Sequence, residues 1–215
     1  MSTEHTVKDG EYLSSIAADY GFSSYRSIWD HPQNAALKAQ RKNPNVLLPG
    51  DILFIPHREA EVVPAATEER HRFQLTVSPL KLRIVVKDEN DEPKANTTFR
   101  LTVEGKAYTV NTDANGLLVQ TILPTVHSGS LFLQAEGSPT QIEIPLKIGF
   151  LHPVEEISGI QARLNNLGYS AGEIGSGDTA KLRSAIEEFQ SDQGLTPDGE
   201  CSASLQAKLK EVHGC

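Results

Sequence analysis

Histidine is the side chain most often used for metal binding and for proton transfer near neutral pH, and this chain has seven. They are His5, His31, His57, His71, His127, His152 and His213. None lies in a His-x-x-x-His helix motif, and none has an Asp or Cys nearby at metal-ligand spacing. We therefore expect no metal site, no zinc hydrolase and no cofactor.

Paired carboxylates are the second kind of chemistry to consider. Cleaving a glycan requires two carboxylates facing each other across a cleft, one with a raised pKa. Glu187 and Glu188 are neighbours on a predicted helix, so their side chains point in different directions. Glu155 and Glu156 are expected to be solvated. No convincing pair is present, and we expect a protein without catalytic residues.

The two cysteines, Cys201 and Cys215, are too few for a disulfide framework or a four-ligand zinc site. Cys215 has no surrounding scaffold that would hold it as a nucleophile. Cys201 stands at an apolar position and is expected to be a small core residue. A disulfide between the two stays open.

Composition excludes several classes of protein. The 215 residues include 20 Lys and Arg against 28 Asp and Glu, a net charge of −8, which disfavours nucleic acid and anionic membranes as partners. No apolar run approaches the roughly 20 residues that span a bilayer. The first residues show no basic stretch followed by an apolar one, so we expect no secretory signal.

The hydrophobic period divides the chain into three segments and a linker. In residues 1–56, apolar side chains at helical spacing predict a helix over 11–20, a second helical piece that holds Trp29 in the core, and a third over 34–41. Strands are predicted around 5–7 and 52–55, which gives the order strand, helix, helix, strand. Residues 57–72 are charged and contain Ala and Pro, as is typical of a linker.

Residues 73–153 change to a period of two. Alternating sets begin at Phe73, Leu80, Phe99, Leu131 and Ile142, and Gly-, Asn- and Asp-rich turns separate them. About seven short strands at this spacing predict an antiparallel β-sandwich.

Residues 154–215 return to the helical period and predict a small three-helix bundle. The three apolar faces are Ile160, Leu164 and Leu167; Leu182, Ala185, Ile186 and Phe189; and Leu205, Leu209 and Val212. The first helix is expected to stop at Gly168. Asp178 or Thr179 is expected to cap the second. The complete chain is thus predicted to be a multidomain α+β protein.

Both ends of the first segment match a known pattern: His5-Thr6-Val7-Lys8-Asp9-Gly10-Glu11, Leu13-Ser14-Ser15-Ile16-Ala17, Tyr20-Gly21, and Leu48-Pro49-Gly50-Asp51-Ile52-Leu53-Phe54-Ile55-Pro56. This combination resembles a LysM module. The resemblance implies a βααβ fold that binds N-acetylglucosamine polymers, chiefly bacterial peptidoglycan.

The LysM resemblance also implies where the glycan would lie. One side of the groove would be formed by Asp9, Gly10, Glu11 and Tyr12. Gly10 would permit close backbone approach, and Tyr12 would supply an apolar wall. The other side has two candidate Asn-Pro turns, which contribute His31 and Asn34, or Asn43 and Asn45. Tyr12 departs from the threonine typical of the family, and about one helix is inserted between the two turns.

The last segment carries Ile160-Gln161-Ala162-Arg163-Leu164, Leu167-Gly168-Tyr169, Ala185-Ile186-Glu187-Glu188-Phe189-Gln190, Gly194-Leu195 and Asp198-Gly199. It resembles the type 1 three-helix peptidoglycan-binding domain. The resemblance implies a wall-binding surface that includes Tyr169, Gln190 and Asp198. The segment departs from the family at 173–178 and at 202–205, where an Asp-Gly turn and a Gly-x-x-Thr sequence are expected.

The middle segment resembles the Ig-like or transthyretin-like spacers of bacterial surface and injection proteins. The three segments together resemble accessory proteins of type VI-like contractile secretion systems. These resemblances imply a non-catalytic protein that binds peptidoglycan or a related glycan at both ends. An adaptor that contacts spike or effector proteins, and an accessory part of a cell-wall hydrolase, are the alternatives.

Two further expectations concern location and charge. The protein is expected to act in the periplasm or cell wall if it is exported by a non-Sec route, and in the cytoplasm otherwise. Residues 154–215 carry five basic and ten acidic groups, so most of the net charge lies there. Peptidoglycan also bears carboxylates, so we expect repulsion between this segment and the wall at low salt.

Overall fold

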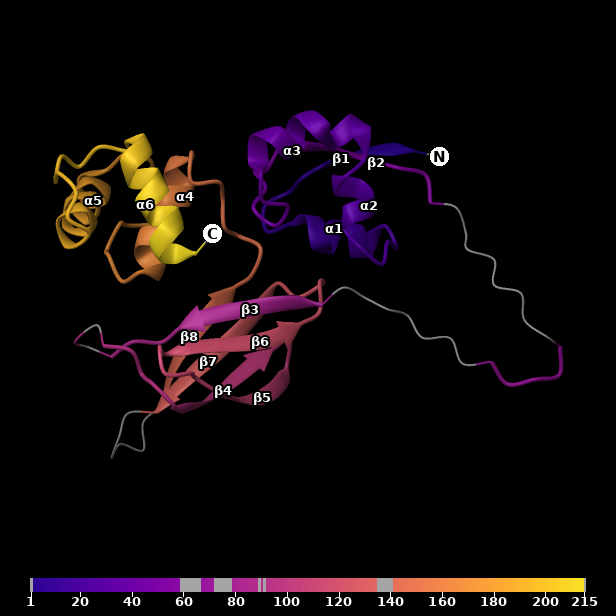
Figure 1. Ribbon diagram of the computed structural model, residues 1–215, viewed down its shortest axis with the longest axis horizontal. Coiled ribbons are helices and arrows are strands. Elements are labelled where there is room, and N and C mark those ends of the chain that lie inside the picture. Colours follow the sequence, from indigo (N-terminus) through magenta and orange to yellow (C-terminus); the bar gives the residue numbers. More distant parts are fainter. Residues whose placement is uncertain are drawn as a thin grey trace.

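The computed structural model describes residues 2–58, 67–71, 79–88, 90, 92–134 and 141–214. The protein is mixed α+β, with helices near both ends and strands between them (Figure 1). Its buried apolar side chains form three separate clusters, one in each segment of the chain. We refer to residues 2–56 as the N-terminal module, to 79–148 as the β module and to 154–214 as the C-terminal module. No helix within the described residues has the length and apolar character needed to cross a bilayer.

The N-terminal module pairs its first and last strands around a group of short helices. Its elements are β1 (Thr3–Thr6), α1 (Leu13–Asp19), α2 (Arg26–Trp29), η1 (Pro32–Asn34), α3 (Ala35–Arg41) and β2 (Ile52–Ile55). The strands are antiparallel, with Thr3 opposite Ile55. Trp29 is 5% exposed and belongs to the core, which confirms that prediction.

Two polar contacts explain details of this module. The helix predicted over 11–20 begins only at Leu13, because Tyr12 is extended and its backbone N–H and C=O both bond to the Ser15 hydroxyl. Arg41 makes two 2.8 Å hydrogen bonds to Asp51, which joins α3 to the turn before β2. Both side chains are only 8% exposed, so this bidentate pair is nearly free of solvent screening.

The β module contains two antiparallel sheets. One pairs β3 (Leu80–Val85) with β6 (Leu117–Ile122); the other has the order β5 (Lys106–Asn111), β4 (Thr98–Val103), β7 (Ser128–Gln134) and β8 (Gln141–Lys147). Leu118 and Ile122 from the first sheet share one core with Leu101 and Leu131 from the second. The two sheets therefore pack against each other.

Two predicted strands of the β module have different outcomes. The strand expected around Phe73 lies outside the described residues. Ile142 and Ile144 were expected to alternate into the core, but they are 56% and 42% exposed. Ile144 lies opposite the buried Leu131 and so is on the core side of the sheet, but β8 is an edge strand among the described strands, and of this alternating set Leu146 is the residue that packs against the shared core.

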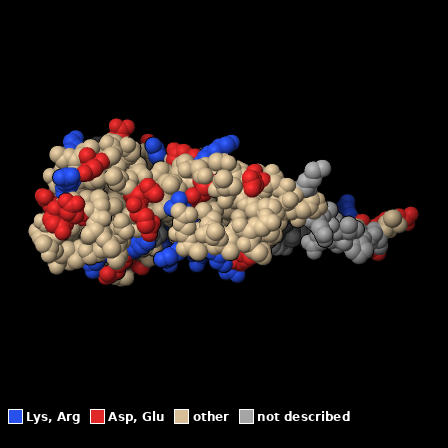
Figure 2. Space-filling view, turned by 90° about the horizontal axis from the view of Figure 1, so that it is seen from above, with Lys and Arg blue, Asp and Glu red and all other residues tan. Residues whose placement is uncertain are grey.

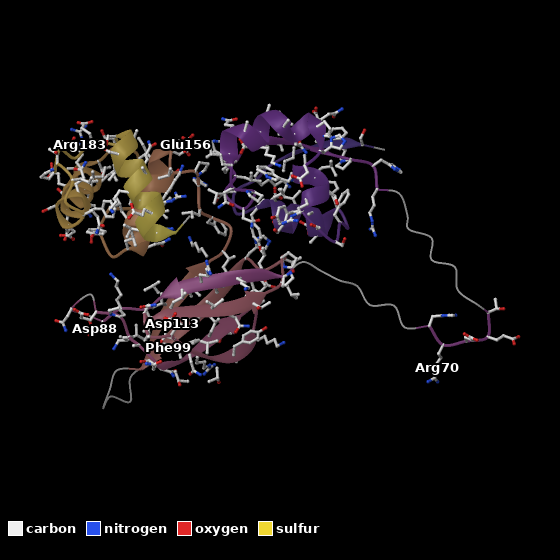
Figure 3. The ribbon with its side chains drawn as sticks, viewed as in Figure 1. Arg70, Asp88, Phe99, Asp113, Glu156 and Arg183 are labelled. Carbon is white, nitrogen blue, oxygen red and sulfur yellow. The ribbon has the colours of Figure 1, made fainter. Side chains whose placement is uncertain are left out.

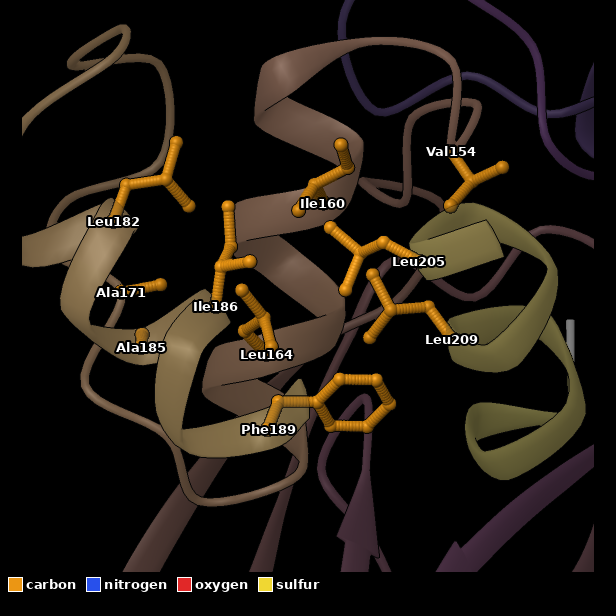
Figure 4. Close-up of a cluster of buried hydrophobic side chains, with 10 residues drawn as sticks. All are labelled: Val154, Ile160, Leu164, Ala171, Leu182, Ala185, Ile186, Phe189, Leu205 and Leu209. Carbon is orange, nitrogen blue, oxygen red and sulfur yellow. The ribbon is translucent and has the colours of Figure 1, made fainter. Parts of the chain in front are cut away.

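The C-terminal module packs α4 (Ile157–Asn166), α5 (Ala180–Asp192) and α6 (Ala203–His213) around ten buried apolar side chains (Figure 4). The Thr179 hydroxyl accepts a hydrogen bond from the Leu182 N–H and so caps α5, which decides between the two predicted caps. Two predictions are wrong. Val212 is 40% exposed. Cys201 is also exposed, because it lies in the loop before α6 and outside the helical apolar face.

Two buried glutamines hold the loops that connect these helices. Gln161 of α4 is fully buried, bonds Ser176 and Gly177 through Nε2, and accepts from the Gly175 N–H. Gln190 of α5 bonds Asp198 and Gly199 in the same way and so holds the following loop. A buried amide has to satisfy both its donors and its acceptor. Each loop is therefore fixed to the helix that precedes it.

Candidate functional site

The structure places Tyr12, the predicted apolar wall of a glycan groove, inside a contact between modules. Its ring is 2% exposed, and its hydroxyl donates a 2.7 Å hydrogen bond to the Val126 carbonyl of the β module. Burial raises the pKa of Tyr12 to about 12, and the negative charges of Glu104 and Asp19 act in the same direction. Tyr12 is therefore unavailable for stacking on a sugar in this arrangement.

Gly10 lies in the same contact and is also covered. Its φ is +81°, and a Cβ there would stand 2.6 Å from the Phe150 ring. Its carbonyl accepts a 3.1 Å hydrogen bond from Nδ1 of His127, whose ring lies 5.6 Å from that of Tyr12. Close backbone approach does occur at Gly10, as expected, but the neighbour is an aromatic side chain of this protein. We call the contact of residues 9–12 with 126–127 and 149–152 the junction.

The two acidic residues of the predicted groove differ from each other. Asp9 is 65% exposed and accepts a 3.3 Å bond from Nε2 of His152, at the edge of the junction. The Glu11 carboxylate accepts from His5 at 2.7 Å and from the Lys8 N–H at 2.9 Å. Burial alone would raise the pKa of Glu11, but the Lys8 N–H and the His5 ring lower it below its usual value. Glu11 thus joins β1 to the turn that precedes α1 within its own module.

The opposite side of the predicted groove had two candidate turns, and the structure separates them. Asn34 is 2% exposed and bonds the Ile28 and Phe54 carbonyls and the Phe54 N–H, so it is a structural residue and cannot reach a ligand. His31 packs its ring 4.6 Å from that of Phe54 and accepts from the Gln33 N–H. The first turn therefore serves to attach η1 to β2.

The second turn, Asn43 to Asn45, adjoins the start of α1. The Pro44 carbonyl accepts from the Leu13 N–H at 3.2 Å, and the Asn45 side chain accepts from the Ser14 hydroxyl at 2.9 Å. The Asn43 side chain accepts from the Asn45 N–H and closes the turn. Asn43 and Asn45 are partly exposed and lie beside the loop that leads into α1. Among the eight predicted groove residues, these two have that position and remain outside the junction.

The residues predicted to bind the wall in the C-terminal module have mainly structural contacts. Gln190 is 2% exposed and bonded to the loop at Asp198, so it cannot reach a ligand. Asp198 is exposed, and the Glu200 N–H, followed by Gln190, lowers its pKa. The Tyr169 hydroxyl donates to Asp192 at 2.9 Å, while its ring packs edge-on against Phe189.

An open depression lies beside α5. It has a volume of about 560 Å³ and is lined by Asn165, Ser170, Gly172, Ala180, Lys181, Ser184, Ala185 and Glu188. Asn165 fixes its wall, because its side chain donates to the Gly172 carbonyl and accepts from the Ala171 N–H. This volume falls within the range of small-ligand sites.

The depression was missed in the sequence, although a signal for it exists. Lys181, Ser184 and Glu188 follow one another at helical spacing, on a polar stripe beside the buried face of α5. All three side chains are exposed, and neither Lys181 nor Glu188 forms an ion pair within the described residues. By contrast, the exposed Arg183 at the outer edge of the module is paired with Asp178 at 2.7 Å (Figure 3).

The C-terminal module as a whole is acidic. Figure 2 shows several carboxylates on the end of the molecule that the C-terminal module forms. Within the described residues, no three His, Cys, Asp or Glu side chains gather as a metal site would need. The lining of the depression offers the charges of Lys181 and Glu188 and the hydroxyls of Ser170 and Ser184 to a ligand.

Residues 154–209 match a protein family whose description reads "Putative peptidoglycan binding domain". The matched range begins just before α4 and ends within α6, so it takes in the three-helix core and the depression. The match supports peptidoglycan binding by this segment of the chain. No match was found among curated proteins or among solved structures.

Proposed function

We propose that this protein is a non-catalytic peptidoglycan-binding protein whose C-terminal module makes the main contact with the wall. The observation that carries the proposal is the family match over residues 154–209. The depression beside α5 supports it, because it supplies an open site with charged and hydroxyl side chains within the matched range.

We propose a second, weaker contact through the LysM-like N-terminal module, made by fewer residues than the sequence predicts. Of its predicted glycan-binding residues, Gly10 and Tyr12 are covered by the junction, and Asn34 is buried. The turn at Asn43 and Asn45 remains open to a glycan containing N-acetylglucosamine. Two weak contacts on one polymer would reinforce each other through effective concentration.

An adaptor is the second candidate function, and the junction favours it. A loop that buries Tyr12 and Gly10 against another module is already used for protein contact. An accessory protein of a type VI-like secretion system, bound to its spike or to an effector, would use such contacts. It would reach the periplasm with that machine; without export, it would act in the cytoplasm.

Cosedimentation with purified, protein-free sacculi tests the leading proposal. We expect the full chain to pellet with sacculi and to leave them intact, as judged by constant turbidity and by a zymogram without clearing. Soluble protein in every fraction would contradict wall binding. Clearing of the gel would contradict the non-catalytic assignment and favour a hydrolase. Co-purification of a spike or effector protein, without sacculus binding, would favour the adaptor.

A further inference from the structure

The charges of the depression are arranged along one line. Lys181 and Glu188 are seven residues apart on α5, which places them on the same face and about 10 Å apart along the helix axis. Ser184 lies between them. The lining thus runs from an ammonium group through a hydroxyl to a carboxylate, with no neutralising ion pair among the described residues.

The lining also lacks what a sugar ring would use. Sugar faces pack on flat apolar or aromatic side chains, and none of the eight lining residues is aromatic. The apolar side chains of the lining are those of Ala180 and Ala185, which are small and offer no flat face, and Ala185 is only 2% exposed. A neutral glycan strand would leave both charged ends without a partner.

Peptidoglycan has a second component with complementary chemistry. Its short peptide stems carry free carboxylates and, where they contain a diamino acid, a primary amine. A carboxylate would pair with the Lys181 ammonium and an amine with the Glu188 carboxylate. The hydroxyls of Ser170 and Ser184 also line the depression and can bond peptide groups of the ligand.

We propose that the depression binds a zwitterionic peptide stem of peptidoglycan, and that this site does not bind the glycan strand. The inference rests on the proposed function and specifies the component of the wall that is recognised. It also assigns roles that sequence reasoning did not: Lys181 binds the carboxylate end and Glu188 binds the amine end. The C-terminal module is acidic and repels carboxylates, and the Lys181 ammonium offsets this repulsion locally for a ligand that carries one.

Pairing variants of the full chain with chemically blocked ligands tests this inference. The probe is the stem peptide N-acetyl-L-Ala-γ-D-Glu-meso-diaminopimelyl-D-Ala, with analogues acetylated at the diaminopimelate amine or amidated at the carboxylates. Isothermal titration gives the affinities. Acetylating the amine should weaken binding to the wild type by about two- to fivefold, the size of one exposed ion pair. Glu188→Gln should lose that sensitivity, while Lys181→Gln should lose the sensitivity to amidation.

The exposed pair Lys208 and Glu211 on α6 supplies the control, because it lies outside the depression. Lys208→Gln and Glu211→Gln should keep wild-type sensitivity to both blocked ligands. The inference is overturned if Lys181→Gln and Glu188→Gln also keep it, or if the peptide does not bind at millimolar concentration while chitin oligosaccharides do. Failure to pellet with sacculi would instead overturn the proposed function, so the two failures are distinguishable.

Discussion

Removal of one hydroxyl at the junction should loosen the N-terminal module from the β module. Tyr12→Phe keeps the ring but leaves the Val126 carbonyl without the donor that bonds it at 2.7 Å. Val126 is 5% exposed, so water does not readily replace that donor. An unpaired buried acceptor costs about 1–3 kcal/mol. The docking equilibrium should therefore fall by about five- to 150-fold.

The assay is ¹⁵N relaxation of the full chain, which reports the rotational correlation time of each module. In the wild type, the N-terminal and β modules should tumble together. In Tyr12→Phe, the N-terminal module should tumble faster, and more so when Gly149→Ala is added. Gly149 has a φ of +94°, and a Cβ there would overlap the Tyr12 ring and lie 2.6 Å from the Gly10 carbonyl.

Tyr20→Phe is the matched control for this experiment. It also removes a tyrosine hydroxyl from the N-terminal module, but the hydrogen bond of that hydroxyl within the described part of the chain is to His5 of the same module. Its relaxation should match the wild type. Separate tumbling in the wild type, or identical relaxation of Tyr12→Phe and Tyr20→Phe, would show that the Tyr12 hydroxyl does not hold the two modules together.

Three further predictions concern the C-terminal module. Burial, and then the charge of Arg163, lowers the pKa of His213 to about 4, so between pH 6.5 and 4 the unfolded chain binds a proton that the folded chain does not. The free energy of unfolding should fall over that window by about 1–2 kcal/mol after allowance for solvent screening, and His213→Asn should abolish this slope in urea titrations. Gln190→Ala should lower the free energy of unfolding by about 2–4 kcal/mol in urea titrations, because it removes the bonds to the loop at Asp198, yet folded protein should still bind sacculi. Raising NaCl from 10 to 150 mM should strengthen sacculus binding in cosedimentation, because salt screens the repulsion between the acidic module and the wall carboxylates, and we expect this repulsion to outweigh the two exposed ion pairs at Lys181 and Glu188, which salt also screens; weaker binding would show that the ion pairs dominate.

The helices could be predicted from the sequence because their cause is local. In α5, the apolar residues Leu182, Ile186 and Phe189 recur at helical spacing, and the same residues form the core. The cap at Thr179 has a local cause as well. Cys201 was misassigned because one apolar-type residue in a loop carries no periodic information, and the helix begins only after the Ser202 cap.

The candidate site could be predicted only incompletely, since exposure is a property of the complete fold. Tyr12 and Val126 are 114 residues apart in the chain, and no local pattern reveals that one covers the other. Gln190 was selected from a resemblance in sequence, but a polar residue of a motif can equally serve to hold a loop. Lys181 and Glu188 could not be predicted from the sequence, because the depression they line exists only where the loop at Gly172 forms a wall beside α5.

Blocking the depression is a direct test of whether the C-terminal module binds the wall there. Ser184→Trp places a large ring in the middle of the depression, at an exposed position of α5. Ala207→Trp places the same ring at an exposed position of α6 outside it. With both full-length variants folded to the same unfolding midpoint as the wild type, their cosedimentation with purified sacculi is compared. We expect Ala207→Trp to pellet like the wild type and Ser184→Trp to stay in the supernatant. Equal pelleting of the two variants would contradict this expectation.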